Sequence, residues 1–228
     1  MPSDNTSPSI CALVPMKGES ERVPGKNLRD FCGKPLLCHV LHMLQQHNGI
    51  SRIVVNTDSE RIARQASEFT KVVIHERPAA LCGHTVPMNA VLAHDLQLLG
   101  EGHYLQTHVT NPLLAGATIT EAIGRYFSLL SEYDSLFSVI SHRSRFFDAV
   151  QRALNHDPAV LLNTQDLAPL YEENSCIYLF SHASFFGNQL NRVGRRYALY
   201  AMSKLESIDI DTEEDFRLAE LAWKAFRG

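Results

Sequence analysis

A short apolar run followed at once by a glycine- and lysine-rich loop constrains this chain more than any other feature. Residues 10–14, ICALV, are predicted to form a buried strand, because such a run bounded by Pro15 and Gly18 is typical of a parallel sheet covered on both faces. The loop would leave the carboxyl end of that strand, where open α/β sheets bind ligands. Backbone N–H groups of a glycine-rich turn can converge on an anion while cationic side chains supply charge. The segment therefore predicts a phosphate-bearing ligand.

The loop is basic, yet it matches neither of the common phosphate-binding sequences. Its cations are Lys17, Arg22, Lys26, Arg29 and Lys34, against Glu19, Glu21 and Asp30. Six residues separate Gly18 from Gly25-Lys26, whereas a P-loop has four, and Asn27 stands where a P-loop carries its magnesium-binding hydroxyl. A dinucleotide G-x-G-x-x-G is missing from the sequence too, which argues against a nicotinamide oxidoreductase. Nucleotide or phosphate binding is the prediction, and an ordinary basic surface turn is the alternative.

Alternating strand and helix signals predict the architecture. Further strands are expected at residues 53–55, 72–74, 103–109, 135–140 and 177–180, and helices at 35–46, 88–99 and about 118–130, with Asp58 or Ser59 capping another. Such alternation implies an α/β fold with a doubly wound, mostly parallel sheet. The alternation weakens over about 143–173, which is expected to be an insertion or an extended arm. Residues 10–228, including this stretch, are expected to form a single domain, preceded by a flexible tail at 1–9.

Composition and charge exclude several classes of protein. A chain of 228 residues that is 45% hydrophobic can bury one sizeable core. The net charge of −4, without a basic stripe, argues against a nucleic-acid partner. Apolar runs fall short of the roughly 20 residues that span a membrane, and we expect neither a membrane partner nor a signal segment. Five cysteines, odd in number and without a C-x-x-C pair, predict reduced thiols in the cytoplasm, with neither disulfides nor zinc.

A second constellation lies near the end of the chain, at Asp209-Ile210-Asp211. If residues 207–210 end a strand, alternate side chains share one face, and both carboxylates can face a ligand. Mg²⁺ takes oxygen ligands and typically sits between one or two carboxylates and substrate phosphates. Magnesium binding by Asp209 and Asp211 is therefore predicted. The alternative is that Asp211 caps the final helix.

Five motifs carry a resemblance to a known family. They are KGESERVPGKN at 17–27, VVNTD at 54–58, RPAAL at 77–81, TNPL at 110–113 and SIDIDT at 207–212. In this order they resemble the A-R-x-x-S-K-x-x-P-x-K-N, V-S-T-D, R-P-A-E-L, T-S-P-L and S-I-D-I-D-T motifs of the acylneuraminate (CMP-sialic acid synthetase) cytidylyltransferases. Ordered matches over nearly the whole chain make chance an unlikely explanation. The resemblance implies a Rossmann-like nucleotidyltransferase fold, CTP and a small acidic sugar as partners, Mg²⁺ as cofactor, and a homodimer formed through the arm.

The resemblance also implies roles for residues of the motifs. The triphosphate would be bound by Lys17, Gly18, Ser20, Arg22, Lys26 and Asn27, and the base and ribose by Asn56, Thr57, Asp58 and Arg77. The reaction itself would depend on Lys17, Lys26 and Asp211, through attack of an acceptor oxygen on the α-phosphorus of CTP. Two alternatives stay open: Asp58 could be a helix cap, and Arg77 a surface residue paired with a nearby acid.

The acceptor side departs from the family pattern. His108 replaces the glutamine of Q-P-T, and Glu173 replaces the basic residue before N-G-A-I-Y. We therefore expect an α-keto sugar acid other than ordinary sialic acid, bound by His108, Thr110, Asn111, Asn174 and Tyr178, with Arg143, Arg145 and Gln165 as candidates for its carboxylate. At the end of a strand, His108 as a neutral imidazole could hydrogen-bond the acceptor or the ribose. A non-sugar acceptor such as a phosphonate, and a non-catalytic nucleotide-binding relative, remain as alternatives.

Overall fold

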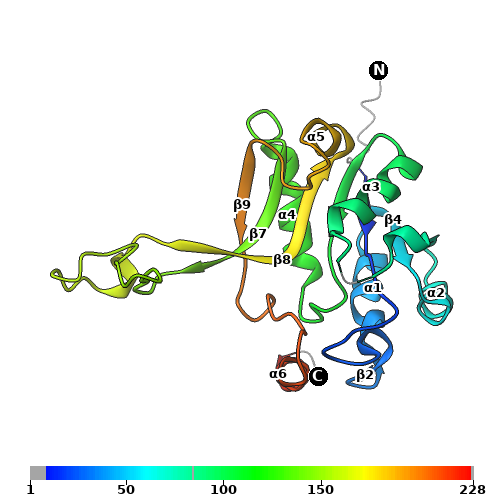
Figure 1. Ribbon diagram of the computed structural model, residues 1–228, viewed down its shortest axis with the longest axis horizontal. Helices are drawn as coiled ribbons and strands as arrows, with labels where there is room; N and C mark the ends of the chain where they lie inside the picture. The colour runs from blue at the N-terminus through cyan, green and yellow to red at the C-terminus, as the bar shows by residue number, and fades with distance from the viewer. Residues whose placement is uncertain (1–8, 84, 227–228) are drawn as a thin grey trace.

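The protein, described by a computed structural model over residues 9–83 and 85–226, is built on one seven-stranded sheet (Figure 1). The strand order is β5-β4-β1-β6-β8-β7-β9. The strands are β1 (Ile10–Leu13), β4 (Ile50–Thr57), β5 (Val72–Glu76), β6 (His103–Gln106), β7 (Ser135–His142), β8 (Leu170–Ser181) and β9 (Tyr197–Ala201). Strands β2 (Asp30–Phe31) and β3 (Lys34–Pro35) form a separate hairpin. Apart from Ser9, the tail predicted at 1–9 lies outside the described residues.

The predicted doubly wound, mostly parallel sheet is confirmed, with one strand running the other way. Strands β5, β4, β1 and β6 are parallel, and β9 is parallel to β7, whereas β8 is antiparallel to both β6 and β7. The predicted strand at 177–180 is only the end of β8, and β9 was not predicted at all. The predicted strand at 103–109 ends already at Gln106. Crossovers between parallel strands account for the first half of the chain, and the long β7–β8 hairpin accounts for much of the second.

Helices cover both faces of the sheet. They are α1 (Leu36–Gln46), α2 (Glu60–Ala66), α3 (Met88–Leu99), α4 (Gly116–Ser128), α5 (His182–Gly187) and α6 (Glu213–Phe226), with single 3₁₀ turns η1 (Lys26–Leu28), η2 (Ala79–Leu81) and η3 (Thr164–Asp166). Alternate residues of β1 enter opposite cores, because side chains of a strand alternate between faces. Ala12 packs with α1, α2 and α4, and Leu13 packs with α3 and α5. Two apolar layers therefore sandwich the sheet.

A third, smaller core joins the two ends of the chain. Val23, from the loop after β1, packs with Ile210, Phe31 of the β2–β3 hairpin and Phe216 of α6, and all four are buried. The guanidinium of Arg29 lies 4.1 Å from the centroid of the Phe216 ring. Burying a side chain of this size stabilises a fold by about 1.5–3 kcal/mol. This core holds the segment with the two aspartates beside the lysine-rich loop, and Figure 1 shows α6 next to β2.

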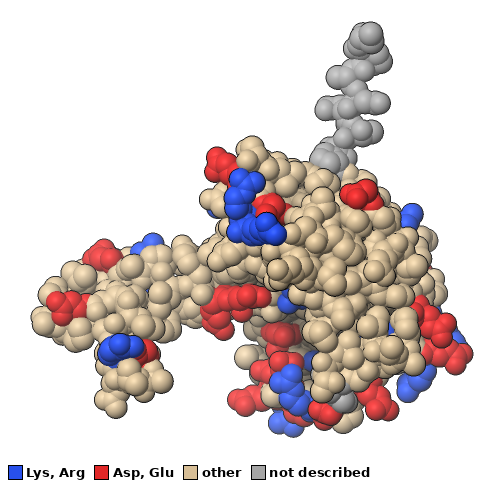
Figure 2. Space-filling view, turned by 45° about the horizontal axis from the view of Figure 1, so that its top comes forward, with Lys and Arg blue, Asp and Glu red and all other residues tan. Residues whose placement is uncertain are grey.

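The segment between β7 and β8, residues 143–169, projects from the body as an arm (Figure 1). Its surface in Figure 2 is largely uncharged. The arm exposes a set of large apolar side chains, Phe147, Val150, Leu154, Val160, Leu161 and Leu162. Leu161 is the most exposed of these side chains, at 92%. Among the described residues, no helix is long and apolar enough to cross a membrane, and the five cysteines carry free thiols.

Candidate functional site

The loop after β1 is fastened at both ends by side chains of the predicted motifs. Gly18 donates its backbone N–H to Asp58 Oδ1 at 2.7 Å, and Asn27 Nδ2 donates to the Lys17 carbonyl at 2.9 Å. A Cβ on Gly18 would lie 2.8 Å from Ser59 Cβ, which is too close for any other residue without a backbone shift. Asp58 therefore fixes the loop, while the cap of α2 is Ser59, so the helix-cap alternative for Asp58 is wrong.

The two aspartates approach this loop on an irregular segment. Residues 207–210 do not end a strand, the condition under which both carboxylates were expected to share one face, because they form no regular ladder. Instead the Ile210 N–H donates to the Thr110 carbonyl at 2.9 Å, and the Ile210 carbonyl accepts from Lys26 Nζ. Asp211 Oδ1 lies 2.9 Å from Arg22 Nη2 and 3.6 Å from Lys26 Nζ. Arg22 and Asp211, which are 189 residues apart in the chain, thus meet at one place together with Lys26.

The helix-cap alternative for Asp211 is wrong as well. The first turn of α6 is closed by Asp215, whose Oδ2 accepts from Thr212 N at 2.8 Å, while the Asp215 N–H lies 3.2 Å from Thr212 Oγ1. This reciprocal pair is a capping box that satisfies helix donors without Asp211. The Asp211 carboxylate is therefore available to the loop cations and to a ligand.

A cavity of about 540 Å³ lies between the loop and the two aspartates. Of the predicted residues it is lined by Lys17, Ser20, Arg22, Lys26, Asn27, His108, Thr110, Asp209 and Asp211. Met16, Glu19, Glu21, Met88 and Ser175 also line it. A second cavity of about 760 Å³ on the other side of the loop is lined by Lys17, Gly18, Ser20 and Asp58, among others. The two share Lys17, Glu19 and Ser20, so the loop separates two halves of one binding region.

Asp209 has the environment of a cation ligand. Its Oδ1 is buried without a hydrogen-bond partner in the described structure, and burial raises the pKa of its carboxyl above the ordinary value. A hydrogen bond from the Thr110 side chain acts in the opposite direction. A buried carboxylate oxygen without a partner is costly. Since Mg²⁺ prefers oxygen ligands and keeps several waters, Asp209 and Asp211 fit such an ion together with substrate phosphates. The described residues contain no group of three or more His, Cys, Asp and Glu that could hold a metal ion on its own.

Three residues predicted to bind the base or ribose are turned inward. Arg77 is 5% exposed and donates to Asn56 Oδ1 at 2.7 Å and to the Asn56 carbonyl at 2.9 Å, so the alternative of a surface residue is wrong. Asn56 is fully buried and also donates to Asp95 Oδ1 at 2.7 Å. Thr57 is 2% exposed. These side chains support the ends of β4 and β5 under the loop. Of the four residues predicted to bind the base and ribose, Asp58 is the one that lines a cavity.

Two of the predicted acceptor residues line the cavity, and three others form hydrogen bonds with nearby protein groups. His108 and Thr110 line the cavity, whereas Asn111 is 1% exposed and donates to the Ile208 carbonyl at 3.3 Å. Asn174 donates to Ser207 Oγ at 3.0 Å, and the Tyr178 hydroxyl donates to Glu173. Glu173 is therefore engaged by the protein, and it does not stand as an unpaired acid at the acceptor site.

The candidates for a carboxylate partner lie away from this cavity. Arg143 Nη1 donates to the Gln165 carbonyl at 3.1 Å and to the Leu167 carbonyl at 2.9 Å, and Arg145 Nη2 donates to the Leu162 carbonyl at 2.6 Å. All these residues belong to the arm, and their hydrogen bonds close it. Within one chain the structure does not bring Arg143, Arg145 or Gln165 into the cavity.

Sequence reasoning missed Gln106, Arg192 and Ser175. Ser175 lines the cavity from a bulge in β8, where its backbone adopts a positive φ of 58°. Arg192, from the segment before β9, donates to Gln106 Oε1 at 2.5 Å and stacks over Tyr178, its Cζ 3.7 Å from the ring centroid. No local pattern could have indicated Arg192, because its partner lies 86 residues away in the chain. Gln106, two residues before His108 at the end of β6, could have been found from the strand alone.

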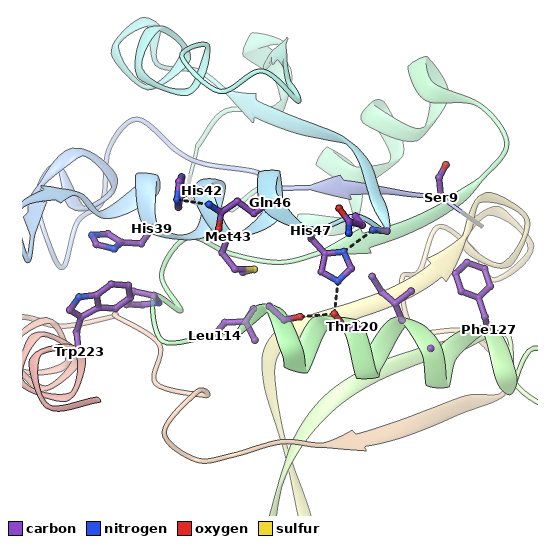
Figure 3. A pocket seen from close by; sticks show the side chains of 16 residues that line it. Ser9, His39, His42, Met43, Gln46, His47, Leu114, Thr120, Phe127 and Trp223 are labelled. Carbon is purple, nitrogen blue, oxygen red and sulfur yellow. Dashed lines mark hydrogen bonds between the residues drawn. The ribbon is translucent and has the colours of Figure 1, made fainter. Parts of the chain in front are cut away.

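A larger cavity of about 1030 Å³ lies elsewhere, between α1 and α4 with Trp223 of α6 at one end (Figure 3). The described residues that line it include no Asp, Glu, Lys or Arg. His47 Nε2 lies 2.8 Å from Thr120 Oγ1, and His39 Nε2 lies 2.8 Å from the Phe31 carbonyl, so these ring nitrogens already have partners. A cavity without cationic side chains does not suit a triphosphate. The candidate site is therefore the smaller cavity, which is lined by the loop cations and the two aspartates.

The fold and this charged edge of the sheet define an α/β protein of the nucleotidyltransferase class. A solved structure of CMP:2-keto-3-deoxy-manno-octonic acid synthetase complexed with CTP superimposes with a TM-score of 0.69 at 17% identity, over 96% of this chain and 99% of that one. The model of the cytidylyltransferase family matches residues 11–222, and the chain belongs to that family. The resemblance seen in the sequence motifs is thereby confirmed.

Two curated relatives show how far the similarity extends. N-acylneuraminate cytidylyltransferase of Streptococcus agalactiae is 26% identical over 219 residues, which cover 91% of this chain and 51% of the relative. CMP-N,N'-diacetyllegionaminic acid synthase of Legionella pneumophila is 28% identical over 225 residues, which cover 92% of this chain and 94% of the relative. The chain thus spans about half the length of the streptococcal relative and nearly all of the other.

Proposed function

We propose that this protein transfers the cytidylyl group of CTP to an α-keto sugar acid. An oxygen of the acceptor would form a bond to the α-phosphorus, the bond from that phosphorus to the β-phosphate oxygen would break, and pyrophosphate would leave. The proton of the acceptor hydroxyl would pass to solvent. The observation that carries the proposal is the meeting of Lys26, Arg22 and the two aspartates around one cavity at the carboxyl edge of the sheet. One relative is named for a sugar acid and the other for the CMP derivative of a sugar acid, which supports this class of acceptor.

In this proposal the loop binds the triphosphate. Lys17, Arg22 and Lys26 would neutralise charge on the phosphates, since in phosphoryl-type transfers the protein acts mostly by positioning and electrostatics. Lys26 is the best placed, because its Nζ is already oriented by the Ile210 carbonyl and its side chain is only 12% exposed. Ser20 and Asn27 line the same cavity. Asp58, with the backbone of Gly18, would shape the half of the region that takes the nucleoside.

Asp209 and Asp211 would hold a Mg²⁺ ion against the phosphates. When bound, this ion would offset charge developing on the α-phosphate and the leaving pyrophosphate. The unpartnered Asp209 Oδ1 supports this role, and the contacts of Asp211 with Arg22 and Lys26 would rearrange to admit the ion. Thr110 orients Asp209 through its side chain.

The cytoplasm is the compartment that we propose for this protein, because it would keep the five free thiols reduced.

We also propose that the arm joins two copies of this chain. Its exposed apolar side chains form a surface that water does not favour, and a second copy would cover them. Leu161→Asp should convert the dimer to a monomer in light scattering after size exclusion. Leu218→Asp on α6, where the native side chain is 52% exposed, is the matched control and should leave the mass unchanged. A monomeric wild-type protein would remove this part of the proposal.

The direct test is pyrophosphate release with CTP, Mg²⁺ and a panel of α-keto sugar acids, with ATP, GTP and UTP as controls. Release with CTP and one acid of the panel is the expected result, and it would identify the acceptor. Turnover only with N-acetylneuraminate would contradict the expectation of a different sugar acid. If no acid of the panel gives pyrophosphate release although calorimetry shows CTP binding, the acceptor is a non-sugar compound such as a phosphonate, or the protein is a non-catalytic relative.

A further inference from the structure

Three side chains form a hydrogen-bonded row that ends at the cavity. Arg192 Nη1 donates to Gln106 Oε1 at 2.5 Å, and Gln106 Nε2 lies 2.9 Å from His108 Nε2. Gln106 is fully buried at the end of β6, and Arg192 is held against the ring of Tyr178. His108 lines the cavity beside Thr110. The row therefore connects a largely enclosed cation to a ring that faces the proposed site.

The chemistry of the three groups gives the row a direction. A guanidinium has only donors, so Gln106 must turn its carbonyl oxygen toward Arg192 and its amide NH₂ toward His108. An amide NH₂ can only donate, so His108 Nε2 must accept and cannot carry the proton. A neutral imidazole with an unprotonated Nε2 carries its proton on Nδ1. Because Nε2 is occupied by Gln106, Nδ1 is the nitrogen left for a ligand in the cavity.

The surroundings keep this ring neutral. Burial lowers the pKa of His108 to about 4, and the positive charges of Arg192 and Lys26 act in the same direction. Asp211, across the cavity, opposes them only in part. These charged groups come from three different parts of the chain, the segment before β9, η1 and the segment before α6. At neutral pH the ring is therefore an uncharged imidazole, with its proton on either Nδ1 or Nε2.

We propose that Arg192 and Gln106 are positioning residues that hold His108 in its Nδ1–H tautomer, so that the ring donates a hydrogen bond to an oxygen of the acceptor. In this state His108 is not a base for the acceptor hydroxyl, because Nδ1, the nitrogen that Gln106 does not occupy, carries the proton and has no free lone pair. The identity of the bound oxygen rests on the proposed function. The tautomer rests only on the row itself.

Gln106→Glu is the sharpest test, because it changes one atom and nearly preserves the shape of the side chain. A glutamate still accepts from Arg192, but the atom facing His108 becomes an oxygen that can only accept. His108 should then place its proton on Nε2 and leave a lone pair on Nδ1. Long-range ¹⁵N–¹H correlation spectra of histidine-labelled protein report both nitrogens, and His108→Gln assigns the resonance by its loss.

At pH 8.5 we expect the Nδ1–H tautomer in the wild type and the Nε2–H tautomer in Gln106→Glu. A wild-type spectrum with the Nε2–H tautomer, or with equal amounts of both, would overturn the proposal. Arg192→Lys keeps a donor for Gln106 and should retain the wild-type spectrum. Arg192→Met removes the donor, which frees the amide to turn over, and should give a mixture. Retention of a single Nδ1–H tautomer in Arg192→Met would show that Arg192 has no positioning role.

Steady-state kinetics provide an independent readout. Gln106→Glu should raise the KM for the acceptor about tenfold or more and change the KM for CTP by less than about twofold, as expected for loss of one hydrogen bond to the acceptor alone. If His108 were instead a general base, freeing its lone pair would raise kcat, and that outcome would refute the donor role. Should every acceptor fail to react, the proposed function fails, while the spectra still decide the tautomer.

Discussion

Replacement of Lys26 by methionine tests the electrostatic part of the site most directly. The change removes the charge and keeps most of the length of the side chain. Lys26 Nζ donates to the Ile210 carbonyl and lies 3.6 Å from Asp211 Oδ1, at the wall of the cavity proposed for the triphosphate. Loss of one preorganised contact of this kind costs about 10²–10³ in rate, or roughly 2.7–4 kcal/mol of transition-state stabilisation. We expect kcat/KM for CTP to fall by that factor.

The same change also affects folding, and its size follows from the same contacts. A hydrogen bond to a charged group contributes about 1.5–3 kcal/mol. The ion pair with Asp211, which is 44% exposed and shared with Arg22, contributes about 0–1 kcal/mol. Since the methionine stem keeps its packing, the expected loss is the sum of these two contributions, about 1.5–4 kcal/mol. In a chain of this length that lowers Tm by roughly 3–16 °C. Assays at 25 °C therefore compare folded proteins.

The assay is pyrophosphate release at saturating acceptor with CTP varied, beside thermal unfolding of each variant. Lys34→Met is the matched control, because Lys34 is exposed on β3 and lines neither half of the binding region. It should change kcat/KM by less than about twofold. A Lys26→Met enzyme that is folded at 25 °C and within about threefold of the wild type would refute the assignment of Lys26 to the triphosphate.

Three further perturbations have definite signs. Gly18→Ala places a Cβ 2.8 Å from Ser59 Cβ, so the loop must shift, and we expect calorimetric CTP affinity to drop about tenfold or more. Asp209→Asn should abolish the rise in Tm that Mg²⁺ with CTP produces in the wild type, with little loss of stability in their absence. Asp215→Ala opens the capping box of α6 and should cost about 0.5–1 kcal/mol in urea unfolding at pH 7.

Each of these has a control variant or a result that would contradict it. Gly124→Ala lies in α4 with nothing within 4 Å of its new Cβ, and it should leave CTP affinity unchanged. Unaltered Mg²⁺ dependence in Asp209→Asn would remove this residue from the metal site. Hydrogen bonds from Thr212 lower the pKa of Asp215, so its contribution is present at neutral pH and is lost as the pH falls through that lowered value. A cost for Asp215→Ala as large at pH 2 as at pH 7 would contradict the capping role.

The elements that the sequence alone determines are those with a strong local signal. The run at 10–14 is readable because a strand covered on both faces is continuously apolar. The stripe of α1 is readable because burial of one helix face imposes a spacing of 3.6 residues, and α3 stops at Gly100, whose φ is positive. The loop cations and the aspartate pair were likewise visible as residue types, and the cavity brings them together. Their roles in binding CTP and Mg²⁺ remain predictions.

Tertiary structure decided the features that depend on which strand or side chain becomes a neighbour. The period of β8 is the same whether it runs parallel or antiparallel to β6, so only the packed sheet shows its direction. Residues 207–210 look like a strand, yet Ile210 bonds to Thr110 and Lys26, and no ladder forms. The contact of Arg192 with Gln106 spans 86 residues without any local signal. Local spacing reports which face of an element is buried, whereas hydrogen bonds between distant segments exist only after the cores have packed.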